Sequence, residues 1–435
     1  MADGMVRGGM VRDGKVQGDT VAAGRPRYYG LLWRWHFFAA LIVIPFVLWQ
    51  STTGTLYLWS EWWMDQTQPA MRFVEPRGTV LPPGAQLAGA IRDAGTGASV
   101  LGMLLPADPA RSTTVLLQGG DGLPYPVFVD PYTAHILGTL TPGQWLPGLT
   151  RALHGGWPLG EAGSWLLELA DGWAIVMVLT GFYLWWPRGR PFPEVLWPRF
   201  RHGARVVVKD LHASVAVLFS LALLFFLISA LPWTSFWGGQ ILSRIQAATG
   251  QTSPAGFSNG GASAAEMLAH GQALDEAVAQ ARARGVKGLL DVRLSPWPGA
   301  PLWLTNQHMP GADRTLHADP RSGQIIRDVR PGDLPAIPRF VAFGIHVHQG
   351  DFGVANLMLN TGLALSLIWL SVTGFVSWWL RRPEGRIAPP PKTATAWPKG
   401  LIVGAVTMCA VLPIFGLSVI VLLAGERMAG ALRGA

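Results

Sequence analysis

The stretch RALHGG at 151–156 opens a segment that closes with TGFYLWWPR at 180–188, and an apolar run of membrane-spanning length lies between the two. The same order returns from IHVHQG at 345–350 to TGFVSWWLRR at 373–382. The two Thr-Gly ends lie 193 positions apart. A long repeat of this kind indicates an internal duplication. Each copy places a histidine at the same end of a membrane helix.

The composition is that of an integral membrane protein. Hydrophobic residues make up 50% of the 435 residues and charged residues only 14%, whereas a soluble protein carries about 25% charge. Many of the 21 tryptophans lie at the edges of apolar runs, as an interfacial aromatic belt requires. The net charge of +8 follows from arginines that flank these runs, so we expect no nucleic-acid partner. The single cysteine, Cys409, excludes covalent c-type haem attachment.

The apolar runs predict an α-helical polytopic protein with about five transmembrane helices. Two large polar segments between the spans predict α+β domains, each with an Asp-Pro turn between strands. In the second segment we expect a helix at 264–284 and strands at 289–294 and 301–305. The predicted boundaries are a disordered tail (1–29), span 1 (30–60), domain 1 (61–164), span 2 (165–187), a loop (188–205), span 3 (206–237), domain 2 (238–350), span 4 (351–381), a linker (382–399), span 5 (400–425) and a tail (426–435).

Basic residues predict the orientation in the membrane. They gather at 187–209 and 381–400, the N-terminal tail ends Arg25-Pro-Arg27, and Arg34 lies at the membrane edge. The positive-inside rule places these segments in the cytoplasm. The N-terminus is then cytoplasmic, and both large domains lie outside the cytoplasm. The tail lacks the apolar core of a signal peptide.

Histidines occur at matched depths in the two copies. His36 and His212 begin the first and third spans, His154 precedes the second, and His346 and His348 precede the fourth. Ionisable residues at membrane helices are costly and are usually functional. Haem iron takes axial histidines, and bundles build cofactor sites from facing helices. One histidine pair near each membrane face therefore favours two b-type haems. Zinc is an alternative, although no acid lies at ligand spacing in the sequence.

Residues near the histidines fit the same interpretation. Adjacent glycines would let a flat macrocycle approach the backbone (Gly155, Gly156, Gly350 and Gly353). Nearby arginines could pair with haem propionates (Arg34, Arg151 and Arg339). The five other histidines are expected on solvated surface (His135, His202, His270, His308 and His317). The Thr-Gly-x-x-x-Trp-Trp endings are expected to pack helices and anchor them at the interface, without a chemical role.

These features together resemble the PepSY-associated transmembrane family, which includes iron-regulated inner-membrane proteins and siderophore reductases of the FoxB type. The resemblance covers about residues 30–382 and includes Asp-Pro turns at 130–131 and 319–320. It implies two PepSY-like periplasmic domains on a four-helix haem-binding core in a bacterial inner membrane. The residues at the positions expected to bind haem are His36, His212, His154 and His348.

Two departures from the family pattern concern the third span and the second outer histidine. The motif at 346–348 contains two histidines, so the ligand there is ambiguous between His346 and His348. The third span ends Ser229-Ala-Leu-Pro232 where the first has Thr53-Gly54. The repeat is therefore weaker at this position than elsewhere.

The resemblance implies reduction of a ferric siderophore in the periplasm. Fe(II) is a softer ion that binds hard oxygen chelators poorly, so reduction releases the metal. Electrons would enter at the haem of His36 and His212 and leave at the haem of His154 and His348 or His346. No dinucleotide-binding motif is present on the cytoplasmic side, so the donor is expected to be a separate cytoplasmic reductase or a quinol.

The alternative is a non-enzymatic membrane protein. Its PepSY-like domains would bind a peptide or regulate a protease, and its helices would serve as an anchor in the lipid bilayer. This interpretation explains the outer domains. It does not explain why both repeats place histidines at matched depths.

Overall fold

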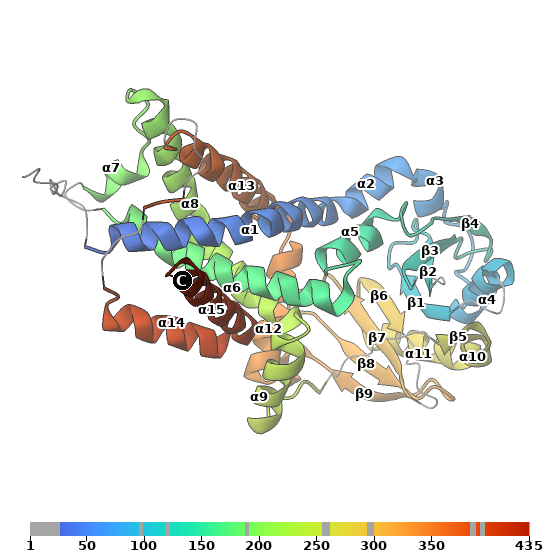
Figure 1. The fold of residues 1–435 in the computed structure, drawn as a ribbon. Coiled ribbons are helices and arrows are strands. Elements are labelled where there is room, and N and C mark those ends of the chain that lie inside the picture. The colour runs from blue at the N-terminus through green and yellow to red at the C-terminus, as the bar shows by residue number, and fades with distance from the viewer. Residues whose placement is uncertain are drawn as a thin grey trace, which may run out of the picture.

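The computed structural model describes residues 27–94, 99–118, 122–187, 191–254, 262–293, 300–382, 389–391 and 396–434. A bundle of long helices lies at one end of the molecule and a β-sheet at the other (Figure 1). Most of the predicted N-terminal tail, residues 1–26, lies outside the described residues, and so does Arg188.

Four long helices form the bundle: α1 (Tyr29–Leu58), α6 (Gly160–Trp185), α8 (Gly203–Ala230) and α13 (Val354–Trp379). Among the described residues, these are the helices that are long and apolar enough to cross a membrane. They match the first four predicted spans. Helix α1 packs against α6 and α13, and α8 packs against the same two helices. The four helices therefore form a closed ring.

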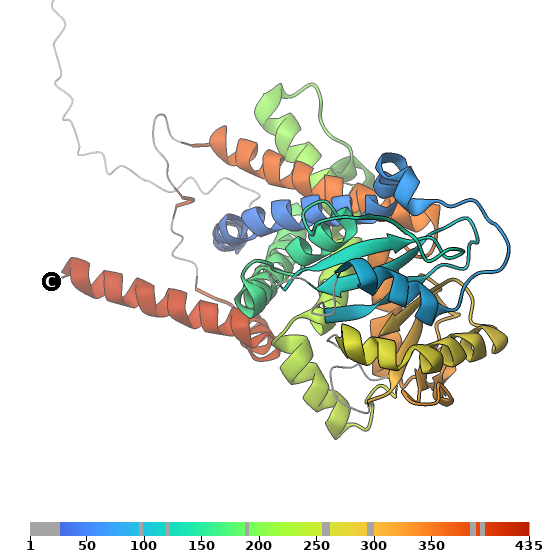
Figure 2. The same cartoon turned by 90° about the vertical axis from the view of Figure 1, so that its right-hand side faces the viewer.

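The fifth predicted span, 400–425, is divided in two and is not confirmed as a single crossing helix. The chain forms α14 (Lys399–Val411) and continues as α15 (Pro413–Gly434) after a break at Leu412. Pro413 has no N–H to donate into the preceding turn, and its fixed φ suits the first position of a new helix. Helix α15 contacts α6 near its start and then extends away from the bundle (Figure 2).

The two extramembrane segments share one antiparallel sheet. Its strands follow the order β4-β3-β2-β1-β6-β7-β8-β9, so the two halves meet where β1 pairs with β6. Their bounds are β1 (Ser99–Leu105), β2 (Thr113–Gln118), β3 (Pro124–Val129), β4 (Ile136–Thr139), β6 (Leu289–Arg293), β7 (Leu302–Gln307), β8 (Thr315–Ala318) and β9 (Ile325–Val329). The two-residue strand β5 (Ala262–Ser263) also pairs with β1.

Helices from both halves pack together over this sheet. Helix α4 (Pro83–Ala94) contacts α11 (Gly271–Ala283) and α10 (Ala264–Ala269). A Cβ added at Gly84 would lie 2.9 Å from the Gly271 oxygen, so α4 and α11 touch at their backbones. A single buried cluster includes Leu87 and Val127 from one half and Leu274 and Leu290 from the other. The two polar segments of the chain thus form one packed unit.

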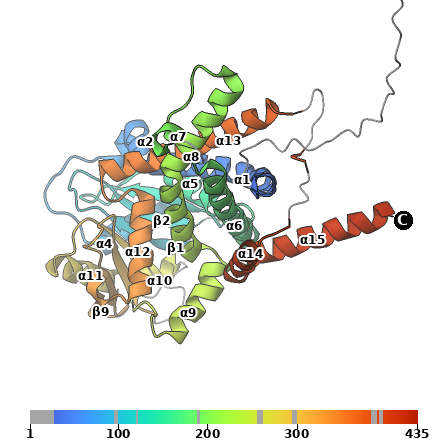
Figure 3. The same cartoon turned by 90° about the vertical axis from the view of Figure 1, so that its left-hand side faces the viewer.

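Shorter helices connect the sheet to the bundle. Helix α5 (Leu146–His154) packs against α1, and α12 (Ala336–Gln349) lies beside α8 (Figure 3). The sequence pattern did not predict either helix. The remaining short elements are α2 (Ser60–Thr67), α3 (Pro69–Arg72), α7 (Phe192–Leu196), η1 (Leu231–Trp233), the π-helix η2 (Trp237–Leu242), α9 (Ser243–Ala248) and η3 (Pro331–Asp333).

Most local predictions in the polar segments are confirmed. Strands occupy 289–293 and 302–307, and both Asp-Pro turns close through their aspartates: Asp130 accepts the Tyr132 N–H at 2.8 Å, and Asp319 accepts the Ser322 N–H at 2.8 Å. The helix expected at 264–284 is interrupted at His270. The expectation that His317 is solvated is wrong, because its ring is buried against Trp303.

Candidate functional site

The four candidate histidines lie at the two ends of the bundle. We call the end beside the sheet the sheet end and the opposite one the distal end (Figure 1). His36 of α1 and His212 of α8 lie in the distal parts of their helices. His154 and His348 lie in the last turns of α5 and α12 at the sheet end. Each pair takes one histidine from each repeat.

A threonine of a neighbouring helix holds each distal imidazole. His36 Nδ1 lies 3.0 Å from the Met177 oxygen and 3.1 Å from Thr180 Oγ1, both on α6. His212 Nδ1 lies 3.0 Å from Thr373 Oγ1 on α13. The two histidines also lie close enough to interact electrostatically. The distal pair therefore draws on all four bundle helices.

The hydroxyl protons of these threonines identify the histidine tautomer. Thr180 donates to the Val176 oxygen at 2.7 Å, and Thr373 donates to the Trp369 oxygen at 2.8 Å. Because a hydroxyl has one proton to donate, each threonine oxygen can only accept from its histidine. Nδ1 is then the protonated nitrogen of the histidine, and the lone pair of Nε2 is free. This is the form in which a neutral imidazole binds a metal.

A glycine directly after each threonine makes room for the ring. A Cβ added at Gly181 would lie 3.3 Å from His36 Cε1, and one added at Gly374 would lie 3.5 Å from His212 Cε1. The rings therefore lie against bare helix backbone. The Thr-Gly parts of the repeated endings hold the histidines, so the interpretation that they only pack helices and anchor the interface is wrong.

A third Thr-Gly pair holds His154 at the sheet end. Its Nδ1 lies 3.0 Å from Thr53 Oγ1 on α1, and Thr53 donates its own proton to the Trp49 oxygen at 2.8 Å. A Cβ added at Gly54 would lie 3.2 Å from His154 Cε1. Gln50 also donates to the His154 backbone oxygen at 3.1 Å. His154 thus has the same tautomer and the same free Nε2 as the distal pair.

His348 faces His154 but is held differently. The two ring centres are 6.0 Å apart, and the His348 ring lies 4.7 Å from the ring of Phe226. Asn360 donates to the His348 backbone oxygen at 3.1 Å. Within the described part of the chain, the His348 imidazole makes no hydrogen bond. Packing alone holds this fourth ring.

His346 is engaged at both ring nitrogens. Its Nδ1 lies 2.6 Å from Asp351 and its Nε2 lies 2.8 Å from Asp313. Burial alone would lower the pKa of His346, but the two carboxylates outweigh it and raise the pKa to about 9. A protonated imidazole has no lone pair for a metal. Of the two alternatives left by the sequence, His348 is therefore the one that faces the site with a free ring.

Asp351 joins this region to the sheet. It also lies 2.7 Å from His308 Nδ1, in the connection between β7 and β8. Burial favours the neutral acid, yet hydrogen bonds from His308 and His346 outweigh it and lower the pKa of Asp351 to about 2. This cluster of charges fixes the loop after α12 and therefore the helix end that carries His348.

The sheet-end histidine pair fits a haem iron better than a zinc ion. A metal–imidazole bond is about 2.0 Å long, so two imidazoles on opposite sides of one iron have ring centres about 6 Å apart. His154 and His348 meet this distance. Zinc sites take at least three protein ligands, and the described residues contain no group of three or more candidate metal ligands. A haem macrocycle supplies the other ligands itself.

The chain matches the family model described as the PepSY-associated TM region over residues 33–381. The chain belongs to this family. The matched range contains α6, α8, α13, all but the first turn of α1, both halves of the sheet and all four candidate histidines. No curated protein matches the chain. The resemblance inferred from the repeats is thereby confirmed at the level of the PepSY-associated family.

The three arginines proposed for haem propionates differ in their surroundings. Arg151 is exposed on α5, one turn before His154. Arg34 donates to the Pro390 oxygen and lies 5.2 Å from the Phe38 ring. Arg339 donates to the Leu334 oxygen at 2.8 Å, and nine positions separate it from His348, about 13 Å along a helix. The role of these arginines toward a propionate stays a prediction.

The glycines beside the histidines have another role than the one expected. Gly156 adopts a φ of +103°, and a Cβ there would lie 2.8 Å from the Gly163 backbone of α6. Gly350 ends α12 with a φ of +82°. These glycines allow sharp turns and close packing, whereas Gly54, Gly181 and Gly374 border the rings. In the sequence, the three glycines that border the rings could be recognised because each directly follows a threonine.

Proposed function

We propose that this PepSY-associated protein is a two-haem electron-transfer protein of a bacterial inner membrane that reduces ferric siderophores in the periplasm and releases Fe(II). The observation that carries the proposal is the pair of matched histidine sites at opposite ends of one bundle. Three of the four rings are oriented by threonine so that Nε2 is free. A structural anchor needs neither this orientation nor its repetition.

The residues have distinct tasks in this proposal. His36 and His212 would hold a distal haem, and His154 and His348 would hold a haem at the sheet end. When bound, haem iron supplies one-electron redox chemistry whose potential depends on its ligands and their hydrogen bonds. Arg151, one turn before His154 on α5, would offer a cation to a propionate.

The charges at the distal end support an inward orientation for it. Arg199 and Arg201 precede α8, Arg205 lies in its first turn, and Arg381 and Arg382 follow α13. The positive-inside rule places this end in the cytoplasm and the sheet in the periplasm. The ferric chelate would then meet the protein beside the sheet. The electron donor would be a separate partner, either a cytoplasmic reductase or a quinol within the bilayer.

The haem content of the purified chain tests the proposal. A pyridine haemochrome assay should give two b-type haems per chain. His212→Ala should leave one haem, and His154→Ala should also leave one, whereas His135→Ala, which changes an exposed histidine, should leave both. Protein without a Soret band, or His212→Ala with unchanged haem content, would refute it.

The substrate class has its own test. Chemically reduced protein is mixed anaerobically with a ferric siderophore, and its oxidation is followed in the haem absorption bands while a chromogenic chelator traps Fe(II). The matched control is the gallium complex of the same siderophore, which has a similar shape but cannot be reduced under these conditions. Oxidation by the ferric complex alone is expected. Equal responses to both complexes, or to neither, would contradict a reductase function.

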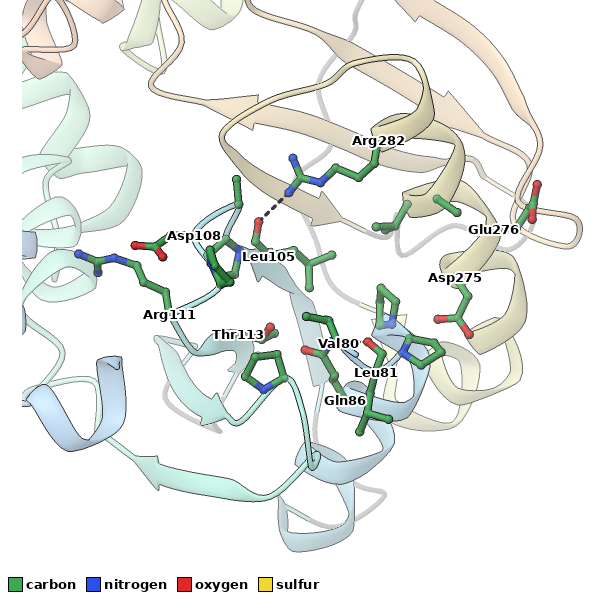
Figure 4. Close-up of a pocket in the computed structure, with 18 of the residues that line it drawn as sticks. Val80, Leu81, Gln86, Leu105, Asp108, Arg111, Thr113, Asp275, Glu276 and Arg282 are labelled. Carbon is green, nitrogen blue, oxygen red and sulfur yellow. Dashed lines mark hydrogen bonds between the residues drawn. The ribbon is translucent and has the colours of Figure 1, made fainter. Parts of the chain in front are cut away.

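A cavity in the sheet unit favours the alternative of a peptide-binding or protease-regulating protein. Its volume is about 650 Å³, and residues of both halves line it, among them Leu81, Leu105, Asp275 and Arg282 (Figure 4). Prolines and aliphatic side chains line it together with several polar and charged groups, a mixture that suits a peptide. A chain that binds peptides but contains no haem would favour this function over electron transfer.

A further inference from the structure

The sheet-end pair differs from the distal pair by one hydrogen bond. At the distal end, threonine oxygens accept from both histidines. At the sheet end, Thr53 accepts from His154, but the described residues provide no acceptor for His348. The two sites thus present ligands of unequal character within an otherwise repeated architecture.

The repeat shows which residues cause the difference. His36 and His212 lie 176 positions apart, and so do Thr53 and Ser229. Ser229 therefore stands where a third-span equivalent of Thr53 is expected. Its hydroxyl donates to the Phe226 oxygen at 3.1 Å and does not reach His348. The fourth histidine therefore has no threonine partner at this position.

The next residue explains why the His348 ring lies elsewhere. Ala230 carries a methyl group at the position equivalent to Gly54. At Gly54, an added Cβ would lie only 3.2 Å from the histidine ring. The same ring position beside α8 is therefore crowded, and His348 instead packs against Phe226, with ring centres 4.7 Å apart. Serine does not supply the acceptor that threonine would, and alanine fills the space that glycine would leave.

A hydrogen bond at Nδ1 changes how strongly the opposite nitrogen donates to a metal. An acceptor on Nδ1–H makes the imidazole more basic. A more basic ligand favours Fe(III) over Fe(II), and hydrogen bonding near the ligands is one of the means by which proteins tune haem potential. Two supported ligands therefore lower the potential of the bound iron more than one supported ligand does.

We propose that Ser229 and Ala230 are positioning residues that raise the reduction potential of the sheet-end site above that of the distal site. Loss of the Thr-Gly pair leaves His348 the weaker donor of the four histidines. The difference in reduction potential favours an electron at the sheet-end site over one at the distal site. The inference deepens the proposed function and rests on haem ligation by the two pairs.

The expected size of the effect is modest and measurable. Changes in the groups that support metal-bound histidines alter metal affinity by about 10- to 100-fold. A single missing hydrogen bond corresponds to the lower end, about tenfold in the redox equilibrium. For a one-electron couple, a tenfold change is about 59 mV. Two midpoints separated by at least this interval can be resolved in an optical titration.

The experiment is a redox titration of the haem-loaded full chain, followed in the haem absorption bands. The wild-type protein should show two midpoints, and His212→Ala should retain the higher one. The double variant Ser229→Thr/Ala230→Gly introduces the Thr-Gly pair. It should lower the higher midpoint potential by about 59 mV, which corresponds to a tenfold change in the redox equilibrium. Thr53→Val removes an acceptor at the same site and should raise it. Thr373→Val is the matched control, because it should raise only the lower midpoint.

The possible results are distinct. Two haems with coincident midpoints, or a higher midpoint that survives in His154→Ala instead of His212→Ala, would overturn this inference and leave the proposed function standing. Unchanged midpoints in both sheet-end variants would do the same. A chain without haem overturns the proposed function and this inference together. If the double variant does not fold, Thr53→Val tests the inference instead, because its higher midpoint should rise. An unchanged higher midpoint would overturn the inference.

Discussion

Removal of the Thr53 hydroxyl should weaken the sheet-end site by a calculable amount. Thr53 is 4% exposed, and its oxygen accepts the Nδ1 proton of His154 at 3.0 Å. Valine has nearly the same shape but cannot accept. A buried donor left without a partner costs about 1–3 kcal/mol. The Gln50 carbonyl also lies near His154, so we expect the lower end, about 1 kcal/mol, which is about a fivefold effect.

The assay is the rate at which purified Thr53→Val loses haem to an excess of a haem-scavenging apoprotein. One of its two haems should leave about fivefold faster than in the wild type. Thr53→Ser keeps the hydroxyl and should behave as the wild type. Ser229→Ala removes the equivalent hydroxyl, which touches no histidine, and should also leave the rate unchanged. Equal rates for Thr53→Val and the wild type would refute the supporting role of the threonine.

Three further predictions concern stability. Leu290→Ala, in the fully buried core shared by both repeats, should lower the free energy of unfolding by about 3 kcal/mol, and circular dichroism should show one melting step for the sheet, not two. Gly163→Ala would place a Cβ 2.1 Å from a backbone oxygen of the α5–α6 turn and should cost about 1–3 kcal/mol, whereas Gly400→Ala, with open space around it, should not lower the melting temperature. The raised pKa of His346, about 9 against an ordinary 6.5, gives stability that is complete below pH 6.5 and lost as the pH rises through 9. The lowered pKa of Asp351, about 2 against 3.8, gives stability that is complete above pH 3.8 and lost as the pH falls through 2. Denaturation midpoints measured over a pH series should show that Asp351→Asn reduces the loss of stability at both high and low pH. The same pH dependence in the variant and the wild type would contradict the interaction of Asp351 with His346.

The sequence predicts the features of this protein that are local. The four bundle helices follow from apolar runs of sufficient length, because hydropathy is a property of each segment alone. Hydropathy alone does not predict the break at Leu412, because the apolar run continues across Pro413, although proline is favoured at the start of a helix. The strands follow from alternation and turns, but alternation does not identify neighbours. Pairing of β1 with β6 was therefore visible only in the fold.

The histidines were recognisable because the duplication repeats them. Their supports were not, since Thr180 lies 144 positions from His36 and touches it only across two packed helices. The choice between His346 and His348 likewise depended on Asp313, which reaches the His346 ring only after β8 and β9 return the chain to the bundle. Contacts of this kind are set by tertiary packing, which one sequence does not reveal.

The duplication is necessary for the sites and not only for their number. One repeat alone contains a single histidine at each end of its two long helices, because His36 pairs with His212 and His154 pairs with His348 across the repeats. The rings are held within a repeat, as Thr180 holds His36, but they face a partner from the other repeat. The sheet also depends on both repeats, since its central β1–β6 pair and its core join the two halves. Assembly of the two halves therefore creates both histidine pairs at once, and a later change in one copy, such as Ser229 in place of threonine, can alter one site without disturbing the other.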